Sequence, residues 1–480
     1  MPRPRVLPVL LSSFCLFLWS PLCSAAPAAT PSAPPRPPNL ILILADDLGW
    51  ADLGCYGNRF NETPHLDRLA REGLRFTQFY AGPVCSPTRA NLQSGQDQAR
   101  FGITQHIPGH RRPFARLTDP VVPAQLPLGV ETFAERLRAA GYATGYFGKW
   151  HLGGAGFSPA DQGWSVVRET QGHTQPAAPP ERPAPQRTAE FLTDHAVAFI
   201  AENRARPFVL QVSHYAVHIP LSTTPELEKK FSAKPPQPGY PSNPVYAGLL
   251  AELDASVGRI VAAVDAAGLA ENTLVVFLSD NGGLEHEQSG RIVTSNRPLR
   301  GEKGSLYEGG IRIPALARWP GTILAGRTSA APARTHDIYP TFLGLAGVPP
   351  PDATRQPLDG LSLAAHLRDP AAPVVRDALH WHLPHYHHST PASAIRRGDW
   401  KLIEFFEDGA LELYDLAADP AESVNLAARE PARARDLRAA LDAWRTRVGA
   451  RLPVPNPQHD PARASELARG DNAAKKKKAR

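Results

Sequence analysis

The most regular feature of the sequence is a set of short aliphatic runs that each end in polar residues. The first is NLILILADD, which begins at Asn39 and closes with two aspartates. FVLQVSH and TLVVFLSDN repeat the pattern further along the chain. Unbroken aliphatic runs are typical of strands that are buried on both faces, as in parallel sheets. The sequence therefore predicts a parallel sheet that is covered on both sides.

Amphipathic segments separate these runs and predict helices. One covers Glu131 to Ala140 and stops at Gly141, after which a strand is expected near Tyr142 to Phe147. A longer segment, VYAGLLAELDASVGRIVAAVDAAGL, ends near Gly268. Buried strands that alternate with helices predict an α/β sandwich with helices on both faces of the sheet. In such sheets ligands bind beyond the carboxyl ends of the strands.

From about residue 375 the pattern changes to two strand-like runs that are joined by Glu407-Asp408-Gly409, a hairpin signal. The helical segment ARARDLRAALDAWRTRV follows them. We therefore expect a main domain over residues 39–374 and a C-terminal subdomain, a small antiparallel sheet with a helix, over residues 375–465.

The two ends of the chain differ in composition from its body. Residues 1–26 combine Arg3 and Arg5 with an apolar run and small residues, which predicts a signal peptide. Residues 27–38 predict a linker rich in Pro and Ala, and residues 466–480 a disordered basic tail. We expect export to the periplasm or the extracellular space, with no membrane span after signal cleavage.

The charge of the body follows once the ends are set aside. The formal net charge is +6, of which two charges belong to the predicted leader and four to the last ten residues. The remaining chain sums to zero. A neutral body argues against nucleic acid as the main partner.

Oxygen-bearing side chains follow two of the aliphatic runs. Asp46 and Asp47 come after the first, and Asp280 and Asn281 come after TLVVFLS. Taken singly, each is an ordinary turn or capping residue. Their shared position at strand ends favours convergence on one point, where four oxygen ligands would suit Ca²⁺ or Mg²⁺.

Cationic side chains lie in comparable segments. Lys149 and His151 alternate in GKWHLGG, and Lys303 lies in RGEKGS, so these residues could hold an anion with several oxygens. His218, in HYAVHIP, could protonate a leaving oxygen. The alternatives are exposed ion pairs for the lysines and a structural hydrogen bond for the histidine.

The cysteines provide the most specific signal. After the leader only Cys55 and Cys85 remain, which is too few for a disulfide scaffold. The segment CSPTR, which begins at Cys85, resembles the C-x-P-[STA]-R signature of type I sulfatases. GYATGYFGKWHLG is similar to the second signature of that family. LSDNGG, RGEKGSLYEGGIRIP and ELYDLAADPAESVNLA resemble other family stretches in matching order, so the resemblance covers nearly the whole mature chain.

This resemblance implies an alkaline-phosphatase-like fold, in which helices enclose a large mixed, mostly parallel sheet and a small C-terminal antiparallel sheet carries a helix. It implies that a formylglycine-generating enzyme oxidises Cys85 to Cα-formylglycine. One hydroxyl of the hydrated aldehyde would attack sulfur, and the other would then expel sulfate. One Ca²⁺ would face position 85 and be held by Asp46, Asp47, Asp280 and Asn281.

The same resemblance assigns roles to the cationic residues. Arg89 would orient the hydrated aldehyde, and Lys149 and Lys303 would bind sulfate oxygens. His151 would assist the expulsion of sulfate, and His218 would donate a proton to the leaving alcohol.

Three stretches depart from the family or vary within it. Leu92-Gln93-Ser94 stands where the family usually has two bulky apolar residues and then Thr, and His65 replaces a usual Asn. The Pro-rich residues 173–187 lie where relatives vary, which weakens any inference of the substrate by analogy.

A histidine-rich stretch, HWHLPHYHHS, surrounds Trp381 and Tyr386 with five histidines. Three interpretations are open. The stretch could be a substrate-contacting loop in which His382 and His385 touch a sugar, a structural loop, or a second metal site.

These features lead to the hypothesis of an exported, calcium-dependent sulfatase that acts on sulfated carbohydrate, with small aryl sulfates as artificial substrates. One alternative is a phosphodiesterase or phosphonate hydrolase of the same superfamily. The other is a catalytically silent glycan-binding relative, in which Cys85 is never oxidised.

Overall fold

The computed structural model describes residues 36–178, 182 and 184–468. The predicted signal peptide, most of the linker and most of the basic tail lie outside the described residues. The described residues from Pro37 onward belong to one compact unit. Among the described residues, no helix is both long enough and apolar enough to cross a membrane.

A nine-stranded sheet forms the centre of this unit. Its strands are β1 (Asn39–Ala45), β2 (Leu74–Tyr80), β4 (Ala143–Gly148), β5 (Val166–Glu169), β8 (Phe208–Ser213), β9 (Thr273–Ser279), β12 (Arg312–Arg318), β13 (Arg327–Ser329) and β14 (Ala333–Arg334). Their order is β13-β2-β12-β9-β1-β8-β4-β5, and β14 also pairs with β2. β12 runs antiparallel to its neighbours β9 and β2, whereas the other pairs are parallel. The expected mixed, mostly parallel sheet is confirmed.

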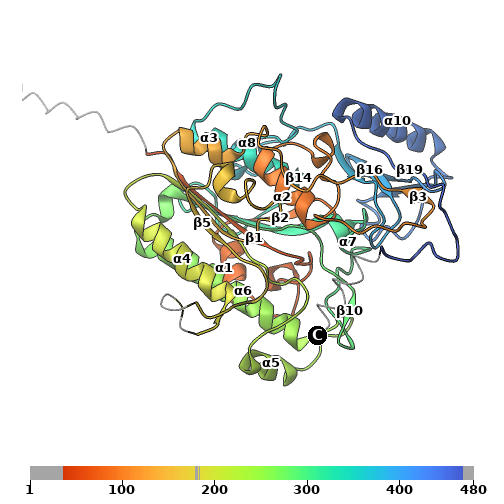
Figure 1. The fold of residues 1–480 in the computed structure, drawn as a ribbon. Coiled ribbons are helices and arrows are strands. Elements are labelled where there is room, and N and C mark those ends of the chain that lie inside the picture. The colour runs from red at the N-terminus through yellow and green to blue at the C-terminus, as the bar shows by residue number, and fades with distance from the viewer. Residues whose placement is uncertain (1–35, 179–181, 183, 469–480) are drawn as a thin grey trace, which may run out of the picture. The chain divides into compact units, whose positions relative to one another are not determined.

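Helices cover both faces of this sheet (Figure 1). They are α1 (Pro64–Arg71), α2 (Cys85–Ser94), α3 (Phe133–Ala139), α4 (Thr188–Glu202), α5 (Pro225–Ser232), α6 (Pro244–Ala266), α7 (Glu308–Ile311), α8 (Ile338–Ala346), α9 (Ala364–Arg368) and α10 (Pro431–Val448). The helix expected over Glu131 to Ala140 is α3, which Thr132 caps through a capping box with Glu135. The long amphipathic segment forms α6, which Asn243 caps at its start.

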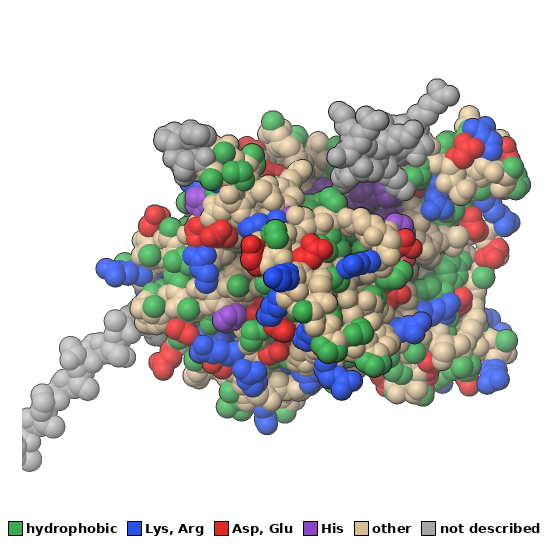
Figure 2. Space-filling model, turned by 90° about the horizontal axis from the view of Figure 1, so that it is seen from below, with side chains coloured by type: hydrophobic (Ala, Val, Ile, Leu, Met, Phe, Trp, Pro, Cys, Tyr) green, Lys and Arg blue, Asp and Glu red, His purple; other side chains and the backbone are tan. Residues whose placement is uncertain are grey.

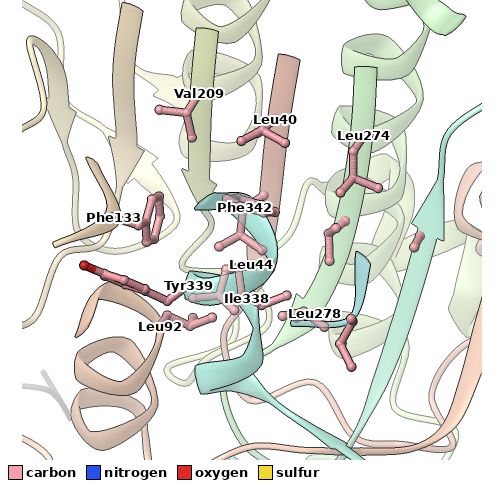
Figure 3. Close-up of a cluster of buried hydrophobic side chains, with 14 of the residues drawn as sticks. Leu40, Leu44, Leu92, Phe133, Val209, Leu274, Leu278, Ile338, Tyr339 and Phe342 are labelled. Atoms are coloured by element: carbon pink, nitrogen blue, oxygen red, sulfur yellow. The ribbon is translucent and has the colours of Figure 1, made fainter. Parts of the chain in front are cut away.

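The alternation of side chains along β1 explains the two helical layers. Leu40, Leu42 and Leu44 enter one buried cluster together with residues of α2, α3 and α8. Ile41 and Ile43 enter the opposite cluster together with residues of α1, α4 and α6. Figure 3 shows the first cluster, where side chains from the sheet meet side chains from the α2, α3 and α8 layer. A strand that is apolar on both faces is thereby buried on both faces.

A four-stranded antiparallel sheet follows near the C-terminus, in the order β15 (Leu379–Leu383), β16 (Ala392–Arg397), β17 (Trp400–Phe405) and β18 (Leu411–Asp415). The predicted hairpin at residues 407–409 joins β17 to β18. One face of the sheet packs on α10. The other face packs on Tyr80 and Ile311 of the main domain, and the Trp381 indole Nε1 donates to the Ala81 carbonyl at 2.9 Å.

Three strand pairs and five short 3-10 turns complete the described elements. The pairs are β3 (Leu117–Thr118) with β19 (Val454–Pro455), β6 (Thr174–Gln175) with β7 (Gln186–Arg187), and β10 (Glu287–Gln288) with β11 (Arg291–Ile292). The turns cover Gly54–Tyr56, Gln98–Arg100, Pro159–Gln162, Ala270–Asn272 and Thr335–Asp337. β6 and β7 lie at the two ends of the Pro-rich segment and pair with each other in antiparallel fashion. Acidic and basic side chains are interspersed over the face of the molecule in Figure 2.

Candidate active site

The four oxygen-bearing residues meet beyond the carboxyl ends of β1 and β9. These strands are parallel neighbours with Ala45 opposite Ser279, so the residues that follow each strand emerge side by side. The Asp47 backbone N–H donates to Asp280 Oδ1 at 3.2 Å, and Asn281 Nδ2 donates to Asp47 Oδ1 at 2.8 Å. The structure therefore brings Asp46, Asp47, Asp280 and Asn281 together, all of them buried.

The donor atoms of this group fit a hard cation. Asp46 Oδ1 and Asn281 Oδ1 are buried and accept no hydrogen bond. Buried oxygens of this kind cost free energy unless a ligand or water compensates them. One ligand atom each from Asp46, Asp47 and His218 lies within 4.8 Å of the other two. Because most of the available atoms are oxygens, Ca²⁺ or Mg²⁺ suits the group better than a thiolate-binding metal.

Three cations neutralise the carboxylates. Arg89, on α2, donates through Nε and Nη2 to Asp280 Oδ2 at 3.1 and 2.7 Å. Lys149 pairs with Asp46, and Lys303 Nζ lies 2.7 Å from Asp47 Oδ1. Both lysines are almost fully buried, so their charges are fixed inside the site and are not the exposed ion pairs of the alternative interpretation.

The cations and the burial shift the carboxyl groups in opposite directions. Burial alone raises each carboxyl pKa, but Lys149 and its neighbours hold the pKa of Asp46 below its usual range. Lys303 does the same for the pKa of Asp47. Burial and the adjacent Asp46 charge raise the pKa of Asp280 to about 6.

Cys85 is the first residue of α2, and it lies against His151. Its Sγ is 3.3 Å from His151 Nδ1. The other ring nitrogen, Nε2, donates to the Ile107 carbonyl at 2.6 Å, which leaves Nδ1 as the acceptor facing the thiol. Burial raises the pKa of the Cys85 thiol. Cys55 and Cys85 are both free, so the described chain has no disulfide between them.

His218 closes the site opposite Asp47. Its Nδ1 donates to the Ile219 carbonyl, and its Nε2 lies 3.6 Å from Asp47 Oδ2. Nε2 is therefore the nitrogen that faces the group of carboxylates. Burial and the Lys303 charge lower the pKa of His218 to about 4.

Sequence reasoning missed several residues that hold this site in place. Asp52 is buried beneath the loop after β1 and accepts from the Gly49 N–H at 2.7 Å and from Thr294 Oγ1 at 2.6 Å. The Tyr215 ring lies 5.4 Å from Lys149 Nζ. His173 Nε2 donates to the His218 carbonyl at 2.6 Å, which ties the start of the Pro-rich segment to the site. The only sequence signal was that Asp52 and Tyr215 follow aliphatic runs and that His173 begins the Pro-rich segment.

The histidine-rich stretch does not act as one unit. His382 and His385 are buried: His382 bonds to Ser393 Oγ at 2.7 Å and to the Arg451 carbonyl at 2.9 Å, and His385 Nε2 bonds to Thr104 Oγ1 at 2.8 Å. These contacts match the structural interpretation. Nothing in the position of either side chain supports the predicted contact with a sugar.

The other three histidines of the stretch take different positions. His380 stacks on Trp444 with ring centroids 4.7 Å apart. His388 Nδ1 donates to the Lys303 carbonyl at 2.7 Å, and His387 packs against Gly304. Only the end of the stretch reaches the loop that carries Lys303.

The departures from the signature are structural. Gln93 Nε2 donates to Gln211 Oε1 at 2.8 Å beneath the sheet, and Ser94 Oγ donates to the Ala90 carbonyl at 2.7 Å. Both side chains are buried. His65 is exposed on α1.

A mixed α/β sheet with buried carboxylates, buried cations and a cysteine near its strand ends is typical of hydrolases that act on anionic esters. The sequence matches the sulfatase family over residues 38–348 and the family described as N-sulphoglucosamine sulphohydrolase, C-terminal, over residues 301–445. The chain belongs to the sulfatase family, and it is a sulfuric ester hydrolase like its named relatives.

Three curated relatives show the range of the similarity. Steryl-sulfatase of Mus musculus is 31% identical over 96% of this chain and 90% of its own length. Arylsulfatase A of Homo sapiens is 36% identical over 84% of this chain and 82% of its own. N-acetylgalactosamine-6-sulfatase of Homo sapiens is 34% identical over 69% of this chain and 66% of its own.

Solved structures share the fold. Ps i-CgsB in complex with k-i-k-neocarrahexaose has a TM-score of 0.74 and 25% identity, over 92% of this chain and 98% of that chain. The PsFucS1 sulfatase from Pseudoalteromonas sp. has a TM-score of 0.69 and 25% identity, over 88% of this chain and 92% of that chain. The expected fold class is confirmed.

Proposed function

We propose that this protein is an exported, calcium-dependent sulfatase that hydrolyses sulfate esters of carbohydrates through a formylglycine made from Cys85. The observation that carries the proposal is the buried convergence of four oxygen-bearing side chains, two lysines and Cys85 at the ends of β1 and β9. Such a site combines a place for a cation, a place for an anion and a modifiable nucleophile.

Asp46, Asp47, Asp280 and Asn281 would hold Ca²⁺. The ion would supply positive charge that stabilises negative charge on sulfate oxygens. Its arrival would also compensate the unpaired oxygens of Asp46 and Asn281.

The chain's own residues would bind and orient the ester. Lys149 and Lys303 would bind sulfate oxygens, because both are charged and buried at the site, one beside Asp46 and the other beside Asp47. His151 Nδ1 orients the group at position 85, since its Nε2 is fixed on Ile107. His218 faces the site through Nε2, which carries no proton in the neutral ring, so it would give a proton to the leaving oxygen only as an imidazolium, a form that the negative charge of a bound ester favours.

The assignment of carbohydrate as the substrate class rests on two kinds of support. Two matches carry a saccharide in their printed names, N-acetylgalactosamine-6-sulfatase and the complex with k-i-k-neocarrahexaose. The second is the hydrogen bond from His173, at the start of the Pro-rich segment, to the carbonyl of His218, so this segment lies close to the residue that would face the leaving alcohol.

The test is production of the chain with and without a formylglycine-generating enzyme, followed by mass spectrometry of the peptide that contains Cys85. The converted fraction should scale with turnover of an aryl sulfate, and Cys85→Ala should abolish turnover without unfolding the protein. Full activity with Cys85 wholly unmodified would refute the nucleophile.

Substrate class and alternative chemistry are tested on the same preparation. A panel of sulfated saccharides should include at least one that is hydrolysed with higher kcat/KM than the aryl sulfate.

Paired phosphodiester and phosphonate assays test the alternative hydrolase, which is supported if those esters react faster than every sulfate. Saccharide binding without turnover, by protein whose Cys85 stays unmodified even with the maturation enzyme, would point to the glycan-binding alternative. N-terminal sequencing of exported protein should find cleavage after residue 26.

A further inference from the structure

A group of three histidines lies outside the residues that the proposed reaction uses. His106 and His110 belong to the loop that follows α2, and His387 belongs to the loop between β15 and β16. One ring nitrogen of each lies within 4.8 Å of the other two. The ring centroids are 4.5, 5.6 and 5.4 Å apart. Three imidazoles on one tetrahedral Zn²⁺, with Zn–N bonds of about 2.0–2.1 Å, hold their centroids about 5 Å apart.

The backbone is shaped so that these rings can meet. Gly109 has φ of 86°, which turns the chain between His106 and His110. Gln105 Oε1 accepts from the His110 N–H at 2.8 Å and fixes that turn. A Cβ on Gly304 would lie 1.9 Å from His387 Nδ1, so the ring takes its place only because this residue is glycine.

Two of the ring nitrogens are buried without a partner. Nδ1 of His106 and Nδ1 of His387 make no hydrogen bond. A buried polar atom of this kind costs free energy that a ligand can recover.

The positively charged side chains near the three rings are each held by another partner. The side chains of Lys303 and Lys149 are paired with Asp47 and Asp46. Arg112 Nη2 donates to the His387 carbonyl at 3.0 Å and is thereby held by the main chain. His388, whose ring centroid is 4.5 Å from that of His387, lies 3.9 Å from Glu302, which brings one carboxylate near the group.

We propose that His106, His110 and His387 form a second metal site that binds a divalent metal of the Zn²⁺ type, separate from the carboxylate site. Imidazole ligands select Zn²⁺, Cu²⁺ or Ni²⁺ over Ca²⁺. Three protein ligands leave a fourth position for water or for an oxygen of another ligand. The site adjoins the reaction centre, because the carbonyl of Ile107, the residue after His106, accepts the hydrogen bond that orients His151.

The test measures binding of Zn²⁺ alone to the full chain by calorimetry, after chelation of bound metals and with Ca²⁺ saturating. We expect one Zn²⁺ per chain. His110→Ala and His387→Ala should each weaken binding by at least roughly tenfold, while the control His65→Ala, on the exposed face of α1, should bind as the unaltered chain does. Zn²⁺ should also raise the unfolding midpoint of the unaltered chain and not that of His387→Ala.

Three results would overturn this second site. The first is no uptake of Zn²⁺, and the second is an affinity in both histidine variants equal to that of the unaltered chain. The third is loss of uptake in Asp280→Ala, which would place the ion among the carboxylates. If His387→Ala fails to fold, His110→Ala decides, because its ring is only half-buried. All of these measurements are independent of sulfatase activity, so their failure leaves the proposed reaction untouched.

Discussion

At the scale of single residues, the histidines of the active site are each fixed by one ring nitrogen. His218 is held through Nδ1 by the Ile219 carbonyl, and His151 is held through Nε2 by the Ile107 carbonyl. Carbonyl oxygens only accept, so the held nitrogens carry the protons of the neutral rings. The free nitrogens therefore face different groups, Nε2 of His218 facing the carboxylates and Nδ1 of His151 facing Cys85.

This arrangement makes a prediction for His218. His218→Asn should lower kcat/KM for an alkyl or sugar sulfate by about 10²–10⁴-fold, the range of a general acid, because an alkoxide leaves poorly without a proton. A nitrophenyl sulfate, whose phenolate leaves unaided, should lose much less. Steady-state kinetics on the two substrates with one enzyme preparation provide the comparison. Equal losses on both would place His218 in substrate binding or in folding.

A second prediction concerns the carboxylates. Asp280→Ala should remove both bound Ca²⁺ and activity, since it deletes two oxygens and frees Arg89 from its partner. Elemental analysis and an aryl sulfate assay measure the two effects. The control is Asp194→Ala, which removes an exposed carboxylate paired with Arg259 and should change neither. Stoichiometric calcium retained in an inactive Asp280→Ala protein would show that calcium binding does not need Asp280.

At the scale of elements, Asp52 fixes the loop that follows β1, of which it is a part, through hydrogen bonds to its carboxylate. Its carboxylate is buried, and Tyr240, Tyr246 and Thr294 all donate to it. Burial nevertheless raises the pKa of Asp52 to about 6. The folded state therefore binds a proton more tightly at this residue than the unfolded state does, so this group stabilises the fold below pH 4 and that contribution is lost as the pH rises through 6.

Comparison with Asp52→Asn isolates that contribution. The unfolding free energy of the unaltered chain, relative to that of the variant, should fall by about 2–3 kcal/mol between pH 4 and pH 7, because Asn does not ionise. Urea unfolding at a series of pH values measures it. Changes that both proteins share, including those from Asp280, cancel in the difference. A pH-independent difference would show that Asp52 keeps its ordinary pKa.

At the scale of the whole molecule, a buried charge cluster joins the two sheets. Lys401 of β17 is fully buried and lies 2.9 Å from Glu308 Oε1, at the start of α7, and 2.8 Å from Glu422 Oε1. Tyr80, at the end of β2, donates to Glu308 Oε2 at 2.7 Å. The C-terminal sheet is thus attached to the main sheet through desolvated ion pairs as well as through apolar contacts.

Lys401→Met tests this attachment. Removal of one partner leaves buried carboxylates uncompensated and should cost about 3–5 kcal/mol of unfolding free energy. Because the two sheets share the buried cluster that contains Tyr80, Ile311 and Trp381, far-UV circular dichroism and tryptophan fluorescence should still report one transition at a lower midpoint. The exposed Lys229→Met should leave the midpoint unchanged. A separate early transition of the C-terminal sheet would contradict a single cooperative unit.

The sequence by itself determined the elements whose pattern is local and the site residues whose motif is contiguous. Aliphatic runs such as Leu40 to Leu44 are buried on both faces wherever they lie in a parallel sheet, and polar residues at their carboxyl ends share one edge. That logic predicts Asp46 beside Asp280, and the resemblance to sulfatases adds the roles of Cys85 and Arg89.

Only the tertiary structure decided the roles of the histidines. The histidines of HWHLPHYHHS cannot be distinguished by their sequence pattern. In the fold, His382 is buried in the interior and the His387 ring lies beside that of His106. A histidine acts as a core hydrogen-bonding residue, a stacking partner or a ligand according to which atoms surround it. These atoms lie at very different distances along the chain, 11 residues from His382 in Ser393 and 281 residues from His385 in Thr104. The sequence did not predict the roles of Asp52 and Lys401 for the same reason. The effect of a buried charge depends on the partners that folding brings to it.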